Sequence, residues 1–137
     1  MITRCFSALF LALCFSACVS GPVNIPQHLT PAELIQRGQE AAERKKYDTA
    51  LKYYNALYER NRDNIDLVIT AEYEIAFISF KQNNYQMARD KLNGVLKYYE
   101  DPDAELLPQH FKILANIVLA RIDEKENERT LFSARKK

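Results

Sequence analysis

Apolar side chains in this chain recur three and four positions apart, which is the period of an α-helix. From Thr30 onward the pattern favours helix, and no run alternates apolar and polar residues as a strand does. The last of the predicted helices has a clear apolar face. The sequence therefore predicts an all-α fold of about five helices, at 31–45, 47–60, 65–81, 85–99 and 108–126.

Helix-start and helix-stop residues support these boundaries. Thr30, Pro31 and Glu33 form a capping box, with proline at the first helical position, where its missing N–H costs nothing. The segment Asp101-Pro102-Asp103 ends the fourth helix. Pro108 is expected at the first position of the fifth, because a proline deeper inside would remove a helical hydrogen bond.

The chain also repeats itself. Segments 45–58 and 83–96 align without a gap, and four pairs of matching positions are each 38 residues apart. The shared pattern is a small residue, then an aromatic, then alanine, then a large apolar residue. The pairs are Gly38 and Ala76, Tyr47 and Tyr85, Ala50 and Ala88, and Tyr54 and Leu92.

This pattern resembles the tetratricopeptide repeat, although two generic helical hairpins would share part of it. The resemblance implies antiparallel helical hairpins in a short α-solenoid, with small residues where helix backbones approach. The fifth helix would be the first helix of a third repeat and would cover the end of the stack. We therefore expect a helical domain at 30–126, followed by a polar, basic tail at 127–137 that is either frayed or a docking segment.

The first residues are typical of an export signal. Arg4 precedes an apolar or small run at 5–17, which is too short for a transmembrane helix. The run ends in small residues before Cys18, which resembles the lipobox of bacterial lipoproteins, with Phe15 at the usual leucine position. We expect a signal peptide at 1–17 and lipidation of Cys18. The alternative is an ordinary signal peptide that contains an incidental cysteine.

The expected location follows from this resemblance. Residues 18–29 contain glycine and prolines and lack helical periodicity, so they predict an extended tether. Val19 and Ser20 follow the cysteine in place of the aspartate that retains lipoproteins at the inner membrane. In lipoproteins of double-membrane bacteria, this implies a lipid anchor in the outer membrane with the domain facing the periplasm.

Composition excludes several function classes. Lys and Arg number 19 against 18 Asp and Glu, so no basic excess indicates nucleic-acid binding. The only histidines, His28 and His110, do not have zinc-site spacing, and no glycine-rich phosphate loop is present. The acidic residues at 123–128 are interleaved with basic ones, as on a solvated helix face. We expect no enzyme, no metal and no cofactor.

Candidate binding residues come from the repeat resemblance. Family members usually bind peptides or proteins on the concave face, which the first helix of each repeat lines. In this chain the face includes Gln39 and Glu43 from the first repeat and Tyr73, Phe77, Phe80 and Lys81 from the second. Phe77 and Phe80 fit groove or core equally, and Tyr73 is the better groove candidate. Tyrosines of the second helices, such as Tyr58, form a second docking surface or shield the core.

The tether, the repeat spacing and the long inter-repeat connector, over residues 15–126, resemble the BamD family of outer-membrane lipoproteins. The resemblance implies an adaptor in the machinery that assembles outer-membrane β-barrels, although this chain has about two and a half repeats against the family's five. Two alternatives are a pilotin-like lipoprotein of a secretion system and a periplasmic protein that delivers a small hydrophobic ligand to a transporter.

Overall fold

The computed structural model describes residues 24–136, and every regular element in that range is a helix. The predicted all-α fold of about five helices is confirmed. The predicted signal peptide and Cys18 lie outside the described residues. The α-helices are α1 (Pro31–Glu43), α2 (Tyr47–Arg60), α3 (Ile65–Lys81), α4 (Tyr85–Lys97) and α5 (Gln109–Ala134), with 3-10 helices η1 (Tyr98–Glu100) and η2 (Ala104–Leu106) before α5.

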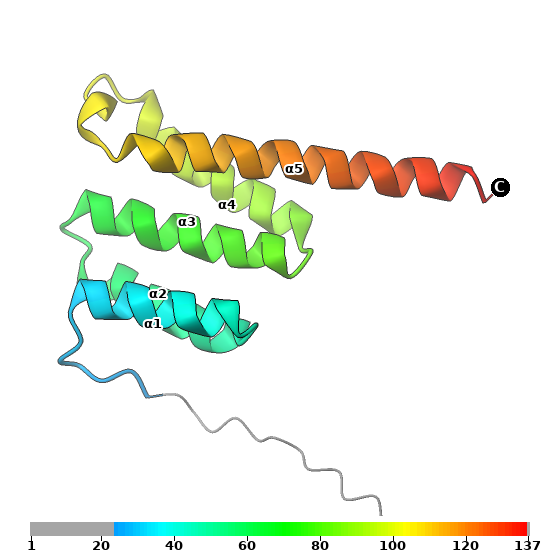
Figure 1. Cartoon of the computed structure of the whole chain (residues 1–137). Coiled ribbons are helices and arrows are strands. Elements are labelled where there is room, and N and C mark those ends of the chain that lie inside the picture. Colours follow the sequence, from blue (N-terminus) through cyan, green and yellow to red (C-terminus); the bar gives the residue numbers. More distant parts are fainter. Residues whose placement is uncertain (1–23, 137) are drawn as a thin grey trace, which may run out of the picture.

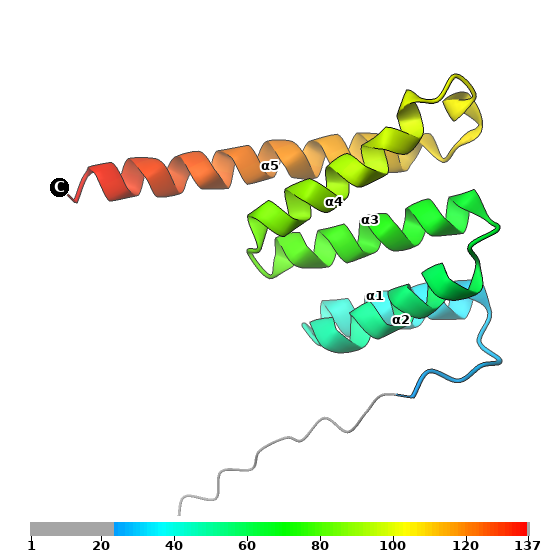
Figure 2. The same cartoon turned by 180° about the vertical axis from the view of Figure 1, so that it is seen from behind.

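The helices stack as consecutive antiparallel hairpins. Helix α1 pairs with α2, α3 pairs with α4, and α5 packs against both α3 and α4 (Figure 1). Helices α1, α3 and α5 face the viewer in Figure 1, while α2 and α4 are in front in the reverse view of Figure 2. The first helix of each hairpin thus contributes to one face of the stack and the second helix to the other.

The 38-residue period is visible in the backbone as well as in the sequence. Lys45 and Asn83 close the two hairpin turns at equivalent positions, with left-handed φ angles of 57° and 60°. In each turn the amide of the next residue donates to the carbonyl five positions earlier, at 2.8 Å and 2.9 Å. This pairing is the Schellman arrangement, in which a left-handed residue satisfies the last carbonyls of a helix.

The small repeat positions lie where helices approach most closely. A Cβ built on Gly38 would lie 2.6 Å from Cε1 of Tyr54, so α1 and α2 pack at a distance that only glycine permits. The three repeat alanines, Ala50, Ala76 and Ala88, are fully buried. Tyr54 and Leu92, the large apolar positions, are also fully buried. Seven of the eight predicted repeat positions therefore belong to the interior of the stack, and Tyr47 is half-buried.

Helix α1 begins as predicted, at the Thr30 cap. The Thr30 hydroxyl accepts from the backbone N–H of Glu33 at 3.3 Å, and the Glu33 carboxylate accepts from the N–H of Thr30 at 2.8 Å. Leu29 before the cap and Leu34 inside the helix belong to one buried cluster, which is a hydrophobic staple. The staple fixes the angle at which the chain enters α1.

The expected tether at 18–29 is ordered at its end. Ile25 packs against the first hairpin, and Leu29 is 6% exposed. The Arg60 guanidinium of α2 donates to the carbonyls of Pro26 and Ile25 at 3.0 Å and 3.2 Å. The packed domain therefore starts before Thr30, because two apolar side chains and one arginine hold the preceding segment against α2.

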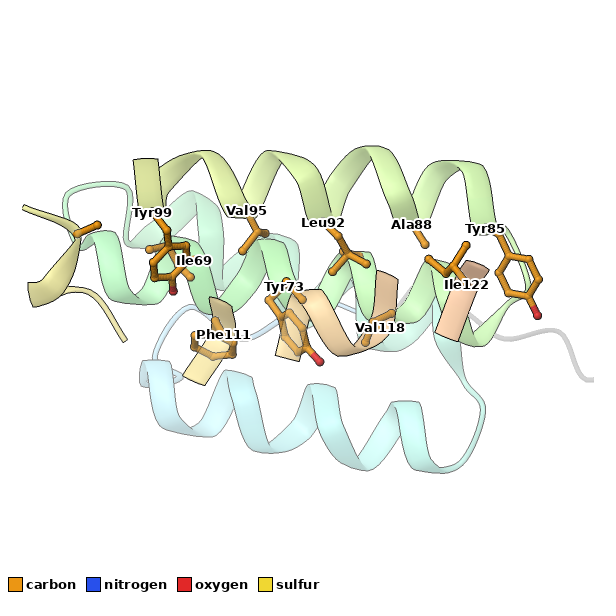
Figure 3. Packing of buried hydrophobic residues seen from close by; sticks show 13 residues of the cluster. Ile69, Tyr73, Tyr85, Ala88, Leu92, Val95, Tyr99, Phe111, Val118 and Ile122 are labelled. Atoms are coloured by element: carbon orange, nitrogen blue, oxygen red, sulfur yellow. The ribbon is translucent and has the colours of Figure 1, made fainter. Parts of the chain in front are cut away.

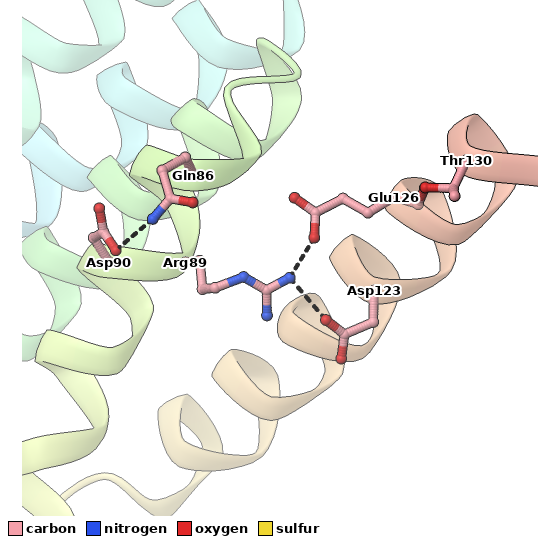
Figure 4. Close-up of polar contacts among 6 residues, drawn as sticks. All are labelled: Gln86, Arg89, Asp90, Asp123, Glu126 and Thr130. Atoms are coloured by element: carbon pink, nitrogen blue, oxygen red, sulfur yellow. Dashed lines mark hydrogen bonds and ion pairs between the residues drawn. The ribbon is translucent and has the colours of Figure 1, made fainter. Parts of the chain in front are cut away.

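Helix α5 runs eight residues beyond the predicted end at 126. Arg89 of α4 donates from Nη2 to Asp123 Oδ1 and to Glu126 Oε2, each at 2.7 Å (Figure 4). The Arg129 guanidinium lies 4.6 Å from the ring centroid of Tyr85. These contacts hold the polar second half of α5 against α4, so the predicted frayed tail is helical to Ala134. Pro108 precedes the helix as its cap rather than opening it.

The largest buried cluster joins α3, α4 and α5 (Figure 3). Leu92 and Val95 of α4 and Ala115 and Ile122 of α5 are fully buried in it. Two smaller clusters hold the first hairpin to α3. None of the helices between residues 24 and 136 combines the length and the apolarity that a membrane span requires.

Candidate functional site

An open groove lies on each face of the stack. One groove has a volume of ≈ 490 Å³ and the other a volume of ≈ 310 Å³. The larger groove runs between α1 and α3 and is closed at its base by α2. Its lining alternates charged and aromatic side chains. The lining residues are Gln39, Ala42, Glu43, Lys45, Tyr47, Tyr54, Glu74, Phe77, Ile78 and Lys81.

Four of the six predicted binding residues meet in this α1–α3 groove. Gln39 and Glu43 line it from α1, and Phe77 and Lys81 line it from α3. Gln39, Glu43 and Lys81 are exposed, and Phe77 is half-buried. The Lys81 Nζ lies 5.3 Å from the ring centroid of Phe77, which is within reach of a cation–π interaction.

The prediction that Tyr73 faces the groove is wrong. Tyr73 is 6% exposed and belongs to the cluster formed by α3, α4 and α5 (Figure 3). Its ring centroid lies 5.2 Å from that of Phe111, because α5 packs across this side of α3. Burial raises the pKa of the Tyr73 hydroxyl to about 12. Tyr73 is therefore a core residue that α5 covers.

Phe80 also lies away from the α1–α3 groove. It is half-buried against the same core cluster, with its ring centroid 5.9 Å from that of Tyr85 and 5.9 Å from that of Phe77. Phe77 takes part in both environments, since it lines the groove and packs against the cluster. The α3 aromatics thus form a continuous row from groove to core rather than one exposed stripe.

The sequence analysis missed two residues at the base of the α1–α3 groove, Tyr54 and Glu74. Tyr54 is fully buried, and its hydroxyl has no hydrogen-bond partner of normal geometry within residues 24–136. Glu74 is a half-buried carboxyl near the middle of α3. A signal for it was present, because Glu72 and Glu74 are the only charged residues between Asp66 and Lys81 of an otherwise apolar helix.

Burial shifts the pKa values of two groups at the base of the groove. Burial raises the pKa of the Glu74 carboxyl, and the neighbouring Tyr54 hydroxyl and Gln39 amide offset part of that rise. Burial is also the main cause that raises the pKa of Tyr54, with the nearby Glu74 and Glu43 carboxylates adding to it. The base of the groove thus holds carboxylates and a phenol. No basic residue is among the groups that shift the pKa of Glu74.

The smaller groove lies on the other face, between α2 and α4. It measures ≈ 310 Å³ and is lined by Tyr58, Glu72, Lys91 and their neighbours. Burial raises the pKa of Glu72, while the neighbouring Tyr98 hydroxyl and the positive charge of Lys91 lower it. This carboxyl therefore has a basic neighbour within its own chain, unlike Glu74.

Among the described residues, no group of three or more histidine, cysteine, aspartate or glutamate side chains is placed to hold a metal ion. His28 and His110 are both exposed and lie on separate segments.

Comparison with known proteins finds one informative relative. The chain is 36% identical over 108 residues to an uncharacterized protein of Treponema pallidum (strain Nichols). The match covers 77% of this chain and 43% of that protein, so the chain spans less than half the length of its relative. No protein-family model matches the chain. No solved structure matches it either.

Proposed function

We propose that this protein is a membrane-anchored adaptor that binds a protein partner in the periplasm, and that its partner belongs to the outer-membrane β-barrel assembly machinery. Lipidated Cys18 attaches it to the outer membrane. The helical stack presents the α1–α3 groove to the partner. The assignment to barrel assembly depends on the sequence resemblance to the BamD family.

The α1–α3 groove is the observation that supports an adaptor most directly. It brings an aromatic, Phe77, together with the polar side chains of Gln39, Glu43 and Lys81. Aromatic anchors surrounded by polar groups are characteristic of protein-interaction surfaces. The groove is lined by residues of both repeats, so a partner that occupies it contacts the two hairpins at once.

Ligand delivery to a transporter is less well supported by the same groove. A site for a small hydrophobic molecule is usually an apolar cavity with few polar groups. Here half-buried Glu74 and exposed Glu43 contribute carboxylates to an open groove. These groups favour a polar partner surface over an apolar ligand.

Affinity capture from native membranes tests the proposed function. The full-length chain with a C-terminal tag would be purified from gently solubilised membranes and its partners identified by mass spectrometry. We expect recovery of the barrel protein of the assembly machinery. The Cys18→Ser chain is the control, and we expect it to leave the membrane fraction after a carbonate wash and to recover less of that partner.

Each of three other outcomes would contradict a different part of the proposal. Recovery of secretion-system or transporter components would reject the assignment to barrel assembly. Retention of the Cys18→Ser chain in washed membranes would reject the lipid anchor. Recovery of a bound small molecule without any protein partner would reject the adaptor function itself.

A further inference from the structure

The base of the α1–α3 groove holds a carboxyl group that the chain leaves without a positive partner. The ion pairs within residues 24–136 join Arg44, Arg62, Arg89 and Lys125 to carboxylates outside the groove, and none reaches Glu74. Half-buried carboxylates are normally paired, because desolvation of an isolated charge is costly. A cation bound in the open groove would offset this cost at Glu74.

Glu72, on the same helix, does have a positive neighbour, so the missing positive partner is particular to Glu74. The two glutamates are two residues apart on α3 and face opposite grooves. Lys91 of α4 and the Tyr98 hydroxyl lie near Glu72. The neighbours of Glu74 are Tyr54 and Gln39, which carry no charge. The same helix thus has one internally compensated carboxyl and one that is open to an external partner.

A second observation concerns the group next to Glu74. Tyr54 lines the groove, and its hydroxyl is buried beside the Glu74 carboxyl and makes no hydrogen bond of normal geometry in the described chain. Native proteins seldom leave such a group unsatisfied, and each exception calls for an explanation. A hydroxyl next to a carboxylate can accept from one N–H of a donor group that also binds the carboxylate.

The two lysines at the rim of the groove do not supply this cation. Lys45 and Lys81 are exposed, and neither forms an ion pair within residues 24–136. The Lys81 Nζ lies over the Phe77 ring instead. Lys81 therefore interacts with an aromatic ring of the groove and does not compensate the Glu74 carboxylate.

We propose that the α1–α3 groove binds an arginine side chain of the partner protein, with its guanidinium on the Glu74 carboxylate and the Tyr54 hydroxyl. A guanidinium presents several N–H donors in one plane, which matches a carboxylate and a neighbouring acceptor better than a lysine ammonium does. The aliphatic part of the side chain lies along the partly exposed Phe77. The inference specifies the partner of the proposed adaptor and so rests on that function.

A small probe tests the site without knowledge of the partner. The full chain, isotope-labelled and kept in a non-ionic detergent, would be titrated with N-acetyl-arginine methylamide and followed by NMR. The neutral isostere N-acetyl-citrulline methylamide is the matched probe. We expect saturable shifts of the Gln39, Glu43 and Glu74 signals at millimolar arginine probe and none with citrulline.

Two isosteric variants separate the groove from the rest of the surface. Glu74→Gln should weaken arginine binding by about tenfold or more, as for the loss of a charge-assisted hydrogen bond. Glu72→Gln, the same change on the same helix, should leave binding unchanged. Equal binding of citrulline, unchanged binding by Glu74→Gln, or no groove shifts at millimolar probe would overturn the proposal.

Tyr54→Phe provides a further test, because it removes only the hydroxyl. If that hydroxyl is unsatisfied in the free protein, the variant should be at least as stable as the parent and should bind the arginine probe several times more weakly. A clear loss of thermal stability would show that Glu74 already satisfies the hydroxyl, and this would overturn the site as described.

Affinity capture with the same variants keeps this inference distinct from the proposed function. Partner recovery that falls with Glu74→Gln, but not with Glu72→Gln, supports both the arginine site and the adaptor function. Full recovery with Glu74→Gln would reject the arginine site and leave the adaptor function intact. Probe binding in a chain that captures no protein partner would retain the cation site and reject the adaptor function.

Discussion

Glu74 is expected to lower the stability of the free protein while it contributes to the proposed binding site. Its carboxyl is desolvated between α1 and α3. The other ionisable groups that line the groove are Glu43, Lys45, Tyr47, Tyr54 and Lys81. A buried group without a charged partner destabilises the free protein. Folding alone therefore does not account for a glutamate at position 74, and the proposed partner would offset its cost.

The stability cost of Glu74 should depend on pH. Burial raises the folded-state pKa of this carboxyl above its ordinary 4.5, so the folded chain holds the proton more tightly than the unfolded chain. The stabilising contribution is complete below about pH 4.5 and is lost as the pH rises through the folded-state pKa. We expect Glu74→Gln to be more stable than the parent at pH 7, by roughly 1 kcal/mol.

Urea unfolding at pH 7 and pH 4 measures this difference. The gain should shrink at pH 4, where the parent carboxyl is protonated in both states. A variant that is less stable than the parent at pH 7 would show that the chain compensates the Glu74 charge after all.

Gly38 and Gly94 offer a matched pair for testing helix packing. A Cβ on Gly38 would meet the Tyr54 ring at 2.6 Å, whereas a Cβ on Gly94 has nothing within 4 Å. Gly38→Ala should therefore destabilise the fold by about 1–2 kcal/mol through overpacking. Gly94→Ala should stabilise it by up to about 1 kcal/mol through helix propensity. Thermal unfolding of both variants checks the signs, and equal shifts would contradict the close α1–α2 contact.

At the scale of elements, α5 consists of two differently attached halves. Its first half contributes Phe111, Ala115 and Val118 to the core, while its second half is fixed mainly through Arg89. Beyond these ion pairs, Leu131 and Phe132 are 65% and 64% exposed. The attachment is thus apolar and stable near the start of the helix, and polar toward its end.

Removal of the Arg89 side chain should loosen only the second half of α5. We expect Arg89→Ala to increase hydrogen exchange of backbone amides at 123–134 several-fold and to leave those at 111–118 unchanged. The melting temperature should change little, because solvent-exposed ion pairs contribute up to about 1 kcal/mol. Exchange measured by mass spectrometry distinguishes the halves, and a uniform increase would show that the ion pairs hold the whole helix.

The predicted elements agree with the structure where local chemistry decides them. Helices α2 and α3 have the predicted bounds, and the Thr30 cap starts α1, because capping residues and apolar periodicity act over a few residues. The α1 boundary is two residues short, since the left-handed residue Lys45 ends the hairpin turn. The length of α5 was missed because contacts with α4, far away in sequence, hold its polar half.

The candidate site was only partly predictable for the same reason. Helical spacing placed Tyr73 and Phe77 on one face of α3 but gave no information on which neighbour covers that face. Helix α5 covers Tyr73 and leaves Phe77 partly open. Tyr54 was expected in the core and is there, but the unsatisfied state of its hydroxyl depends on the α1–α2–α3 packing.

At the scale of the whole molecule, the substantial contacts join helices that are consecutive or next but one. The stack therefore resembles a short column of similar units, in which each unit is stabilised by its neighbours. The described chain enters the stack at the first hairpin, and α5 lies at the opposite end (Figure 1). A partner in the α1–α3 groove would contact the two hairpins that precede α5.

The restriction of contacts to sequence neighbours also determines how the chain acquires its structure. Low contact order allows helical proteins to fold within microseconds to milliseconds. Each hairpin closes through a turn of a few residues, and the repeated left-handed positions at Lys45 and Asn83 set both closures. An emerging chain can therefore form its first hairpin before the residues of α5 have appeared, so folding can follow the direction of synthesis from one end to the other.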